Sequence, residues 1–250
     1  GCTGIKTIRF TGPVLGTIGS NAFKGITATV YYPGMDLDWA NIEKKNYGGT
    51  LTWVPEVSGT GGVLGTNMVW KIEGSTLTIV GKGNMSGWQS GVENPPWYKY
   101  RNDITKVVIA KDITHIGDFA FHYCTNLAEV EFEDESALAT VGNGAFGYIS
   151  PLKSITVPAS VIEIKANAFS FSSDLETVAF EEKSKLTSMG DYTFQQCTAL
   201  KTVYIPDGVT NLGTDILCDA KQTVLQVREN SYAHEYAEQM GYLTELRVPG

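Results

Sequence analysis

The chain has 250 residues, enough for one large domain or two with a sizeable core, and its formal net charge is −8 at pH 7. This acidic balance argues against nucleic acid or an anionic membrane as the main partner, and no apolar run is long enough for membrane insertion. Charged residues make up only 18% of the chain, and its 27 glycines suit a turn-rich β structure.

Residues 1–56 are expected to be the last repeat and the C-terminal cap of a truncated first repeat array. The opening Gly-Cys-Thr-Gly-Ile matches the middle of a repeat unit found later, so we expect the chain to be a fragment of a longer protein. Residues 28–33 and 51–54 are predicted strands, and Asp36 or Asp38 is expected to cap a short helix between them that carries Trp39 and Ile42. The core columns of this unit are assigned to Ile5, Ile8, Phe10, Leu15, Ile18 and Phe23.

Residues 57–103 are expected to be a linker and an N-terminal cap. The Gly/Ser-rich stretch 55–62 predicts the linker, and two alternating runs, 68–72 and 76–80, predict a β-hairpin. An aromatic segment, 88–100, follows the hairpin. Its rings are expected either to cover the first repeat or to stack on a carbohydrate, and the residues of that alternative aromatic site are Trp88, Trp97 and Tyr98.

Residues 104–219 contain one short phrase five times, and a sixth copy begins at Ile18. The five copies begin at Ile116, Val141, Ile164, Met189 and Leu212. They close on Phe121, Phe146, Phe169, Phe194 and Leu217, which lie 25, 23, 25 and 23 residues apart. Self-similarity of this kind predicts a solenoid, in which the same positions of every unit point inward and form one continuous core.

Two further columns accompany the phrase. Glycine follows its first apolar residue at Gly117, Gly142, Gly190 and Gly213, where we expect a backbone bend, although Lys165 breaks the column. Cysteine recurs at one repeat position, and we expect inward-facing apolar side chains there, with a disulfide or a metal site as the alternative. The cysteines are Cys2, Cys124 and Cys197, with Cys218 beside the phenylalanine column.

Residues 220–250 are expected to form the C-terminal cap. A strand over 223–227 and a second over 243–248 flank a predicted helix with Ser231 as its N-cap and Gly241 at its end. The helix buries one face, formed by Ala233, Tyr236, Ala237 and Met240.

The repeat units resemble the BspA-type leucine-rich repeats of bacterial surface and secreted proteins. The shared pattern is L-x-x-[IV]-x-[IV]-P-x-x-[VIL]-x-x-I-G-x-x-A-F-x-x-C, and residues 200–213 match its first part well. The resemblance covers five units in 104–219 and one in 5–25. It implies a curved solenoid with a sheet of short parallel strands on one face and a hairpin before the first repeat. With the 23–25-residue units and the strand–helix–strand C-caps described above, the expected fold class is a β-rich α/β solenoid. It also implies an extracellular or cell-surface location and a role in adhesion.

No catalytic motif is present, and neither an enzyme nor a cofactor is expected. Residues 59–65 only superficially resemble a dinucleotide fingerprint. The three histidines, His115, His122 and His234, have no organised partners and are expected at the surface. The acidic run from Glu129 to Glu135 has the oxygen ligands that Ca²⁺ takes, but a solvated strand and loop is the expected structure.

The residues that alternate with the core columns form two outward rows. One row is Lys106, Glu129, Ser154, Thr177 and Thr202, and the other is Val108, Glu131, Thr156, Ala179 and Tyr204. Small residues flanked by charges make either a protein-binding face or an ordinary solvated sheet. The leading hypothesis is a non-enzymatic binding module for a host or matrix protein. The alternatives are an architectural scaffold for another domain and carbohydrate binding through 88–100.

Overall fold

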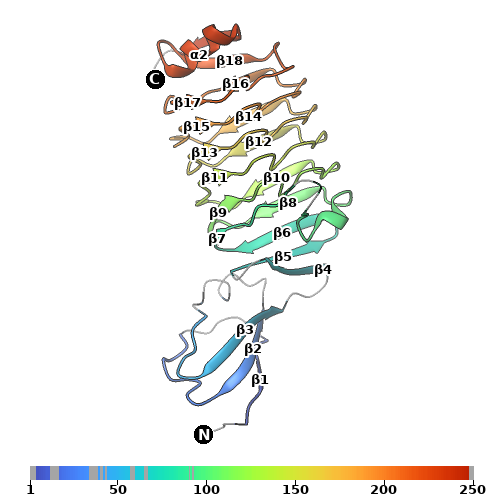
Figure 1. The fold of residues 1–250 in the computed structure, drawn as a ribbon, viewed down its shortest axis with the longest axis vertical. Helices are drawn as coiled ribbons and strands as arrows, with labels where there is room; N and C mark the ends of the chain where they lie inside the picture. Colours follow the sequence, from blue (N-terminus) through green and yellow to red (C-terminus); the bar gives the residue numbers. More distant parts are fainter. Residues whose placement is uncertain are drawn as a thin grey trace.

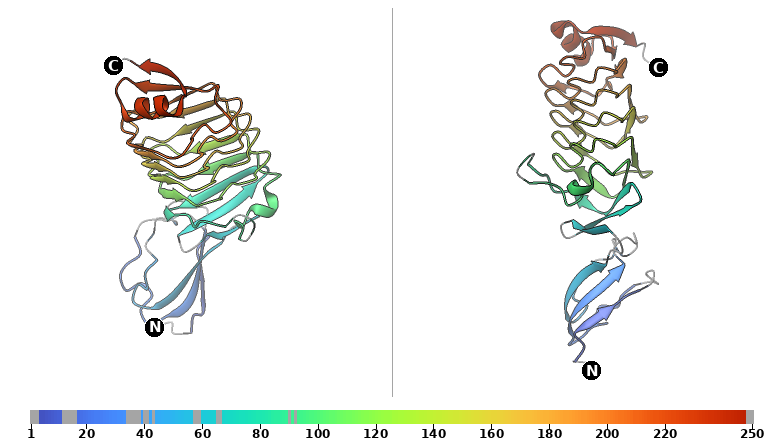
Figure 2. Two further views of the ribbon diagram at one scale, coloured as in Figure 1. Left: turned by 45° about the horizontal axis from the view of Figure 1, so that its top comes forward. Right: turned by 90° about the vertical axis from the view of Figure 1, so that its right-hand side faces the viewer.

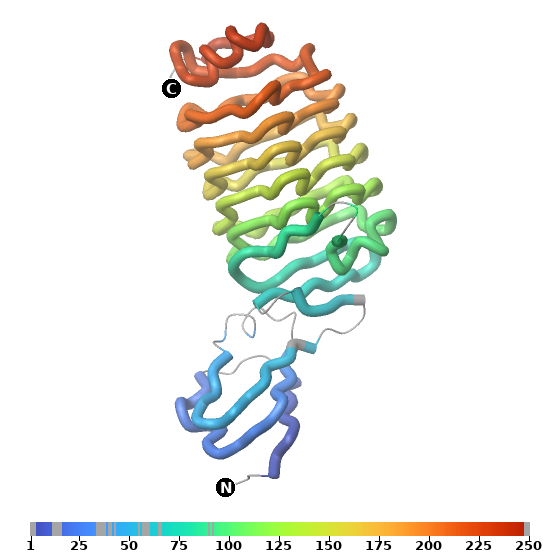
Figure 3. Tube along the Cα trace, in the orientation of Figure 1, coloured from blue at the N-terminus to red at the C-terminus, as the bar shows by residue number. Residues whose placement is uncertain are grey.

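The structure is a computed structural model that describes residues 4–11, 17–33, 39, 42, 44–56, 60–64, 67–89, 91 and 93–247. Its main part is a β-solenoid whose turns stack along one axis, with the C-terminal helix at one end (Figures 1 and 3). The predicted fold class is confirmed. Among the described residues, no helix has the length and apolar character needed to cross a bilayer.

The first part of the chain has a small sheet of three parallel strands, β1 (Thr7–Arg9), β2 (Thr27–Pro33) and β3 (Thr50–Glu56). Its buried side chains are Ala28, Val30, Tyr32 and Trp39. The expected column residues of this unit are only half-buried, namely Ile5, Ile8, Phe10, Ile18 and Phe23. Leu15 and the proposed caps Asp36 and Asp38 lie outside the described residues.

The hairpin predicted before the repeats is confirmed as β5 (Met68–Glu73) and β6 (Thr76–Gly81). A further strand, β4 (Thr60–Leu64), pairs antiparallel with β5. Residues 60–62, which were expected to belong to the linker, are therefore paired with β5. This pairing covers an edge of β5 that would otherwise be open. Residues 55 and 56 end β3, and residues 57–59 lie outside the described part of the chain.

Each solenoid turn contributes one strand to each of two sides (Figure 2). Two of the longer strands, β8 (Lys106–Ile109) and β10 (Glu129–Phe132), continue the hairpin sheet. The others form a separate parallel sheet of β12 (Ser154–Val157), β14 (Thr177–Phe180), β16 (Thr202–Tyr204), β18 (Val224–Arg228) and β19 (Leu243–Arg247). The second sheet has six parallel strands, β7 (Gly83–Asn84), β9 (Ile113–Ile116), β11 (Thr140–Val141), β13 (Glu163–Ile164), β15 (Ser188–Met189) and β17 (Asn211–Leu212).

The third side of each turn carries two residues with positive φ, four positions apart. Most are not glycine, which makes the backbone there costly for the residues that occupy it. The first column is Phe119, Gly144, Asn167, Tyr192 and Asp215, and the second is Tyr123, Tyr148, Phe171, Gln196 and Asp219. In this conformation the N–H groups of one turn donate to carbonyls of the next, as Phe146 N does to Ala168 O at 2.8 Å. The strands bond in the opposite direction, as when Glu129 N donates back to Thr105 O at 3.2 Å.

The phenylalanine column forms a continuous stack of fully buried rings. Centroids of Phe121 and Phe146 are 5.2 Å apart, and the two further steps, through Phe169 to Phe194, are both 5.7 Å. Trp97 extends the stack at its N-terminal end, 5.8 Å from Phe121, and its indole N–H donates to Ala120 O at 2.8 Å. The aromatic segment thus supplies the first ring of the column.

The glycine column is explained by close approach between turns. None of its members has a positive φ, so the expected backbone bend is not the reason for glycine. A Cβ on Gly142 would lie 2.6 Å from Asp118 N and 2.6 Å from Ile116 O in the preceding turn. Glycine is favoured at these four positions because the two backbones touch there, whereas Lys165 occupies the column in the third phrase.

The cysteine column is part of the core. Cys124 and Cys197 are buried free thiols, and burial raises the pKa of each to about 12. They are neutral at pH 7 and pack as small apolar groups. Cys218 is a free thiol that is partly exposed, and Cys2 lies outside the described residues.

The C-terminal strand–helix–strand cap is confirmed, and Ala233, Tyr236 and Ala237 are buried as predicted, but Met240 is 38% exposed because it lies in the last turn of the helix. Ser231 Oγ accepts from His234 N at 3.2 Å at the start of α2 (Tyr232–Met240), and Gly241 ends the helix at φ 68°. The cap satisfies backbone groups of the last repeat turn through tyrosine hydroxyls. Tyr236 Oη accepts from Ile216 N at 3.2 Å and donates to Gly213 O at 2.8 Å.

We predict that Gly142→Ala destabilises the solenoid by about 1–3 kcal/mol, because the added methyl group must separate two packed backbones. Denaturant unfolding followed by circular dichroism measures the loss. Gly19→Ala is the matched control: it occupies the same motif position in the first unit, and its Cβ would meet no atom within 4 Å. Equal effects of the two substitutions would contradict the close-approach explanation.

We predict that Tyr236→Phe destabilises the protein by about 1–3 kcal/mol, because it leaves the buried Ile216 N–H without its acceptor. Tyr232→Phe should cost less, since Tyr232 is 41% exposed and water can replace its hydroxyl beside Leu212 N. Thermal unfolding of both variants gives the comparison. A Tyr236→Phe protein as stable as the Tyr232→Phe protein would show that the cap hydroxyl contributes little.

Candidate functional site

The two outward rows lie side by side on the longer strands, in the register that the repeat predicts. Lys106 pairs with Glu129 and Val108 with Glu131, across β8 and β10. Further along, Ser154 aligns with Thr177 and then Thr202, while Thr156 aligns with Ala179. We call these ten positions of β8, β10, β12, β14 and β16 the strand face. Their role in binding stays a prediction.

Seven of the ten residues are exposed, and the other three are half-buried. Lys106 Nζ lies 2.8 Å from Glu129 Oε1 and 2.6 Å from Glu131 Oε2, and hydrogen bonds to these carboxylates raise its pKa. Tyr204 is partly covered by Arg247 of β19, whose guanidinium carbon lies 4.1 Å from the ring centroid. Val108 is the remaining half-buried residue.

The strand face extends beyond the ten predicted residues at both ends. Thr76 and Thr78 of β6 align with Lys106 and Val108, and Gln226 of β18 aligns with Tyr204. The alternating pattern of both strands is visible in the sequence. The repeat register does not reach them, because neither the hairpin nor the cap contains the repeat phrase.

The strand face is split between β10 and β12. Among the described residues, no strand pairing joins these two neighbours, although β10 pairs with β8 and β12 pairs with β14. Glu133 N donates to Ile109 O at 3.0 Å, but the equivalent donor of the next turn is missing, because Pro158 has no N–H. Pro206 occupies the equivalent position in the fifth unit, shortly after the end of β16. The pairing of β14 and β16 is only two residues long.

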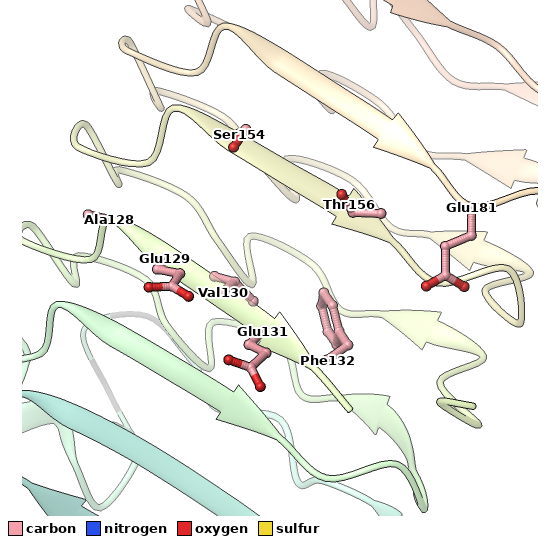
Figure 4. A pocket seen from close by; sticks show the side chains of 8 residues that line it. All are labelled: Ala128, Glu129, Val130, Glu131, Phe132, Ser154, Thr156 and Glu181. Atoms are coloured by element: carbon pink, nitrogen blue, oxygen red, sulfur yellow. The ribbon is translucent and has the colours of Figure 1, made fainter. Parts of the chain in front are cut away.

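A pocket of about 280 Å³ lies at this split (Figure 4). It is lined by Ala128, Glu129, Val130, Glu131, Phe132, Ser154, Thr156 and Glu181. In a parallel ladder, the carbonyls of Ala128 and Val130 and the N–H groups of Ser154 and Thr156 would bond across this junction. The pocket therefore combines unpaired main-chain donors and acceptors with the carboxylates of Glu129 and Glu131.

Two further acidic residues cap turns. Glu133 Oε2 accepts from Lys111 N at 3.0 Å, and Glu181 Oε2 accepts from Ala159 N at 2.8 Å. They occupy the same position in the two longer units. Across the ranges that the structure describes, no group of three or more metal-binding side chains is placed to hold an ion, so the acidic run offers no built Ca²⁺ site there.

The alternative aromatic site is not assembled as expected. Trp97 has no exposed surface because it belongs to the stacked column, so it cannot present a face to a sugar. Trp88 is half-buried, with its ring centroid 5.3 Å from that of Trp97. Tyr98 is also half-buried and begins the short 3₁₀ helix η1 (Tyr98–Tyr100).

The histidines are half-buried, although the sequence predicts that they lie at the surface. His122 packs between aromatic rings, with centroids 5.2 Å from Phe119 and 5.1 Å from Tyr148, and burial lowers its pKa to about 4. Burial also lowers the pKa of His115. His234 Nδ1 accepts from Asn230 N at 3.2 Å.

Comparison with known proteins identifies the repeats. A family model for the BspA type leucine rich repeat region matches residues 96–223 with six copies. No curated protein matches the chain significantly. The matched range covers slightly more than half of the chain and begins beside Trp97.

A comparison with solved structures finds partial matches to bacterial proteins. The pneumococcal vaccine antigen PcpA is 20% identical, with a TM-score of 0.48 over 67% of this chain and 50% of that one. A leucine-rich cell surface protein from Faecalibacterium prausnitzii is 21% identical, with a TM-score of 0.41 over 68% and 55% of the two chains. A leucine-rich repeat protein from Eubacterium ventriosum is 18% identical, with a TM-score of 0.33 over 65% and 70%. The chain thus spans half the length of the pneumococcal antigen, and its own repeats show that it belongs to the BspA-type leucine-rich repeat family.

Proposed function

We propose that this chain is a non-enzymatic protein-binding module of a secreted or surface-anchored bacterial protein. The binding surface is the strand face, and the partner is a host or matrix protein. The observation that carries the proposal is the exposure of two aligned rows of side chains, from β8 to β16, on a rigid stack of turns. Solenoids commonly bind through extended surfaces of this kind. The surface location follows from the resemblance to BspA-type repeats.

The composition of the strand face supports a protein partner. Ser154, Thr156, Thr177, Ala179 and Thr202 are short and exposed, so a partner can approach the backbone closely over three turns. Short side chains also lose little rotamer freedom when they are covered. Charged and aromatic groups border this patch, which gives it the polar edge that protein interfaces have.

The pocket at the split is the proposed centre of recognition. Glu129 and Glu131 share a single cation, Lys106, so this part of the strand face has excess negative charge. The carbonyls of Ala128 and Val130 add acceptors that no strand partner satisfies. A lysine or arginine side chain of the partner would donate hydrogen bonds to these carboxylates and carbonyls, because each cation has several N–H donors.

The competing function is a scaffold that holds another domain and binds nothing itself. It uses the same rigid array but requires no particular residue on the strand face. The two functions therefore differ in their response to surface substitutions that leave the fold intact. Exposed residues suit this test, since their substitution changes stability little.

We predict that the protein captures at least one member of a panel of purified host extracellular-matrix and cell-surface proteins. Glu129→Gln, Glu131→Gln and Tyr204→Ala, combined in one variant, should weaken that capture by about tenfold or more, since they remove the acidic centre and the aromatic border. Surface plasmon resonance at low and high salt measures the effect, and capture by the unsubstituted protein should weaken as salt rises.

The control variant is Glu163→Gln, which makes the same carboxylate-to-amide change on β13 of the second sheet. It should bind like the unsubstituted protein, and thermal unfolding should show that both variants are fully folded at the temperature of the binding measurement. An equal loss of capture in the Glu163→Gln control would show that binding is not specific to the strand face. Absence of any capture by the unsubstituted protein would favour the scaffold.

A further inference from the structure

A second pocket, of about 270 Å³, lies away from the strand face, between the aromatic segment and the first repeat turn. Its lining is predominantly ring-shaped side chains with a few polar groups, and consists of Gly91, Glu93, Asn94, Pro95, Tyr98, Phe119, His122 and Tyr123. None of the sequence-level candidates except Tyr98 belongs to it. The lining therefore combines aromatic surface with polar groups that could fix the orientation of a small ligand.

Both walls of this aromatic pocket are fixed to the solenoid. On the side of the segment, Trp88 N donates to Asp118 O at 2.9 Å and the buried Trp97 indole donates to Ala120 O at 2.8 Å. On the repeat side, Tyr123 N donates to Gly147 O at 3.2 Å. These bonds attach the residues on both sides of the pocket to the first repeat turns.

Tyr123 ends a second aromatic column on the third side of the solenoid. Phe171 stacks on Tyr148 with centroids 4.5 Å apart, and Tyr148 packs on Tyr123 at 4.6 Å. Tyr148 covers Tyr123 and Phe171 covers Tyr148, each from the next turn, and His122 packs beside Tyr123 with ring centroids 4.3 Å apart. No ring precedes Tyr123 in this column within the described residues. Tyr123 is 38% exposed and lines the pocket, so its uncovered surface is available to a ligand.

The charges around the pocket favour an uncharged ligand. The Arg101 guanidinium carbon lies 4.2 Å from the centroid of Tyr98 and places a positive charge behind this wall. That charge opposes a cationic ligand such as a quaternary ammonium group, which otherwise suits aromatic cages. The exposed Glu93 opposes an anion. His122 is neutral at pH 7 because burial among the rings lowers its pKa to about 4.

We propose that the aromatic pocket binds one uncharged pyranose ring of a glycan. A pyranose has an apolar face of C–H groups, which stacks on the negative face of an aromatic ring, and a rim of hydroxyl groups. Tyr123 supplies the stacking surface, while Glu93 and Asn94 supply hydrogen-bond acceptors and donors for the rim. This site is separate from the strand face and does not depend on the protein-binding proposal.

The test uses the full chain and a defined set of soluble probes: glucose, galactose, N-acetylglucosamine, N-acetylgalactosamine and choline. Saturation-transfer-difference NMR detects weak binding, and titration gives the dissociation constant. We expect at least one of the four sugars to bind with a dissociation constant of about 10 mM or tighter, and choline not to bind. Binding of choline alone would overturn the proposal, as would binding of none of the five probes.

Tyr123→Asn removes the stacking ring and should weaken sugar binding by about tenfold or more. Asparagine tolerates the left-handed backbone at this position, where φ is 61°. Phe171→Asn is the matched control, because it removes a ring from the same column at φ 60° without touching the pocket. It should bind within about twofold of the unsubstituted protein. Equal loss in both variants would overturn the assignment of the pocket.

Glu93→Gln provides an independent check, since this exposed residue can change without disturbing the core. A hydroxyl group bonds more strongly to a carboxylate than to an amide, so sugar binding should weaken by about threefold or more. Unchanged binding in the Glu93→Gln protein would show that the Glu93 carboxylate does not contact the sugar, which would contradict the proposed contacts with the hydroxyl rim.

Discussion

The stack of rings from Trp97 to Phe194 fixes the distance between successive turns, and the rest of the solenoid depends on that distance. Ring centroids are 5.2–5.8 Å apart along the column, and every ring in it is fully buried. This spacing is slightly larger than the roughly 4.7–4.9 Å between hydrogen-bonded strands, so stacked rings and paired strands fit into the same turns. The same spacing brings backbones into contact at Gly142 and its equivalents. Aromatic packing and glycine occur together in three of the five phrases, while Lys165 accompanies Phe169 and Gly213 accompanies Leu217.

The features that repeat could be predicted from the sequence, because the residues of each column recur in several units. The phenylalanine column, the outward rows and the register between them follow from spacing alone, and the caps follow from strand and helix patterns at the ends. The reason for the glycine column could not be found in this way. A bend and a close approach both require glycine, and only the positions of the neighbouring turns distinguish them.

The two pockets depend on features that occur only once. The split between β10 and β12 involves a single junction, and Pro158 has the same local sequence context as Pro206, where pairing persists. The aromatic pocket depends on where a non-repeating segment returns to the first turn. Tyr123, Tyr148 and Phe171 do recur two residues after the phenylalanine column, so an aromatic column was detectable. The left-handed backbone of these residues could not be detected from the sequence, because aromatic residues rarely adopt that conformation unless the surrounding structure holds them in it.

The stability of a solenoid is approximately a sum of terms for each repeat and for each interface between neighbours. The interface that contains β10 and β12 keeps its bonds in the second sheet and on the third side, where Gly144 N donates to Ala166 O at 2.9 Å, but it lacks the strand bonds of its neighbours. Cooperativity is therefore weakest there, and the array consists of two blocks, one built on the N-terminal hairpin and the other on the C-terminal cap. Under heat or tension, a break would begin at the junction that carries the strand-face pocket, so occupation of that pocket would also hold the two blocks together.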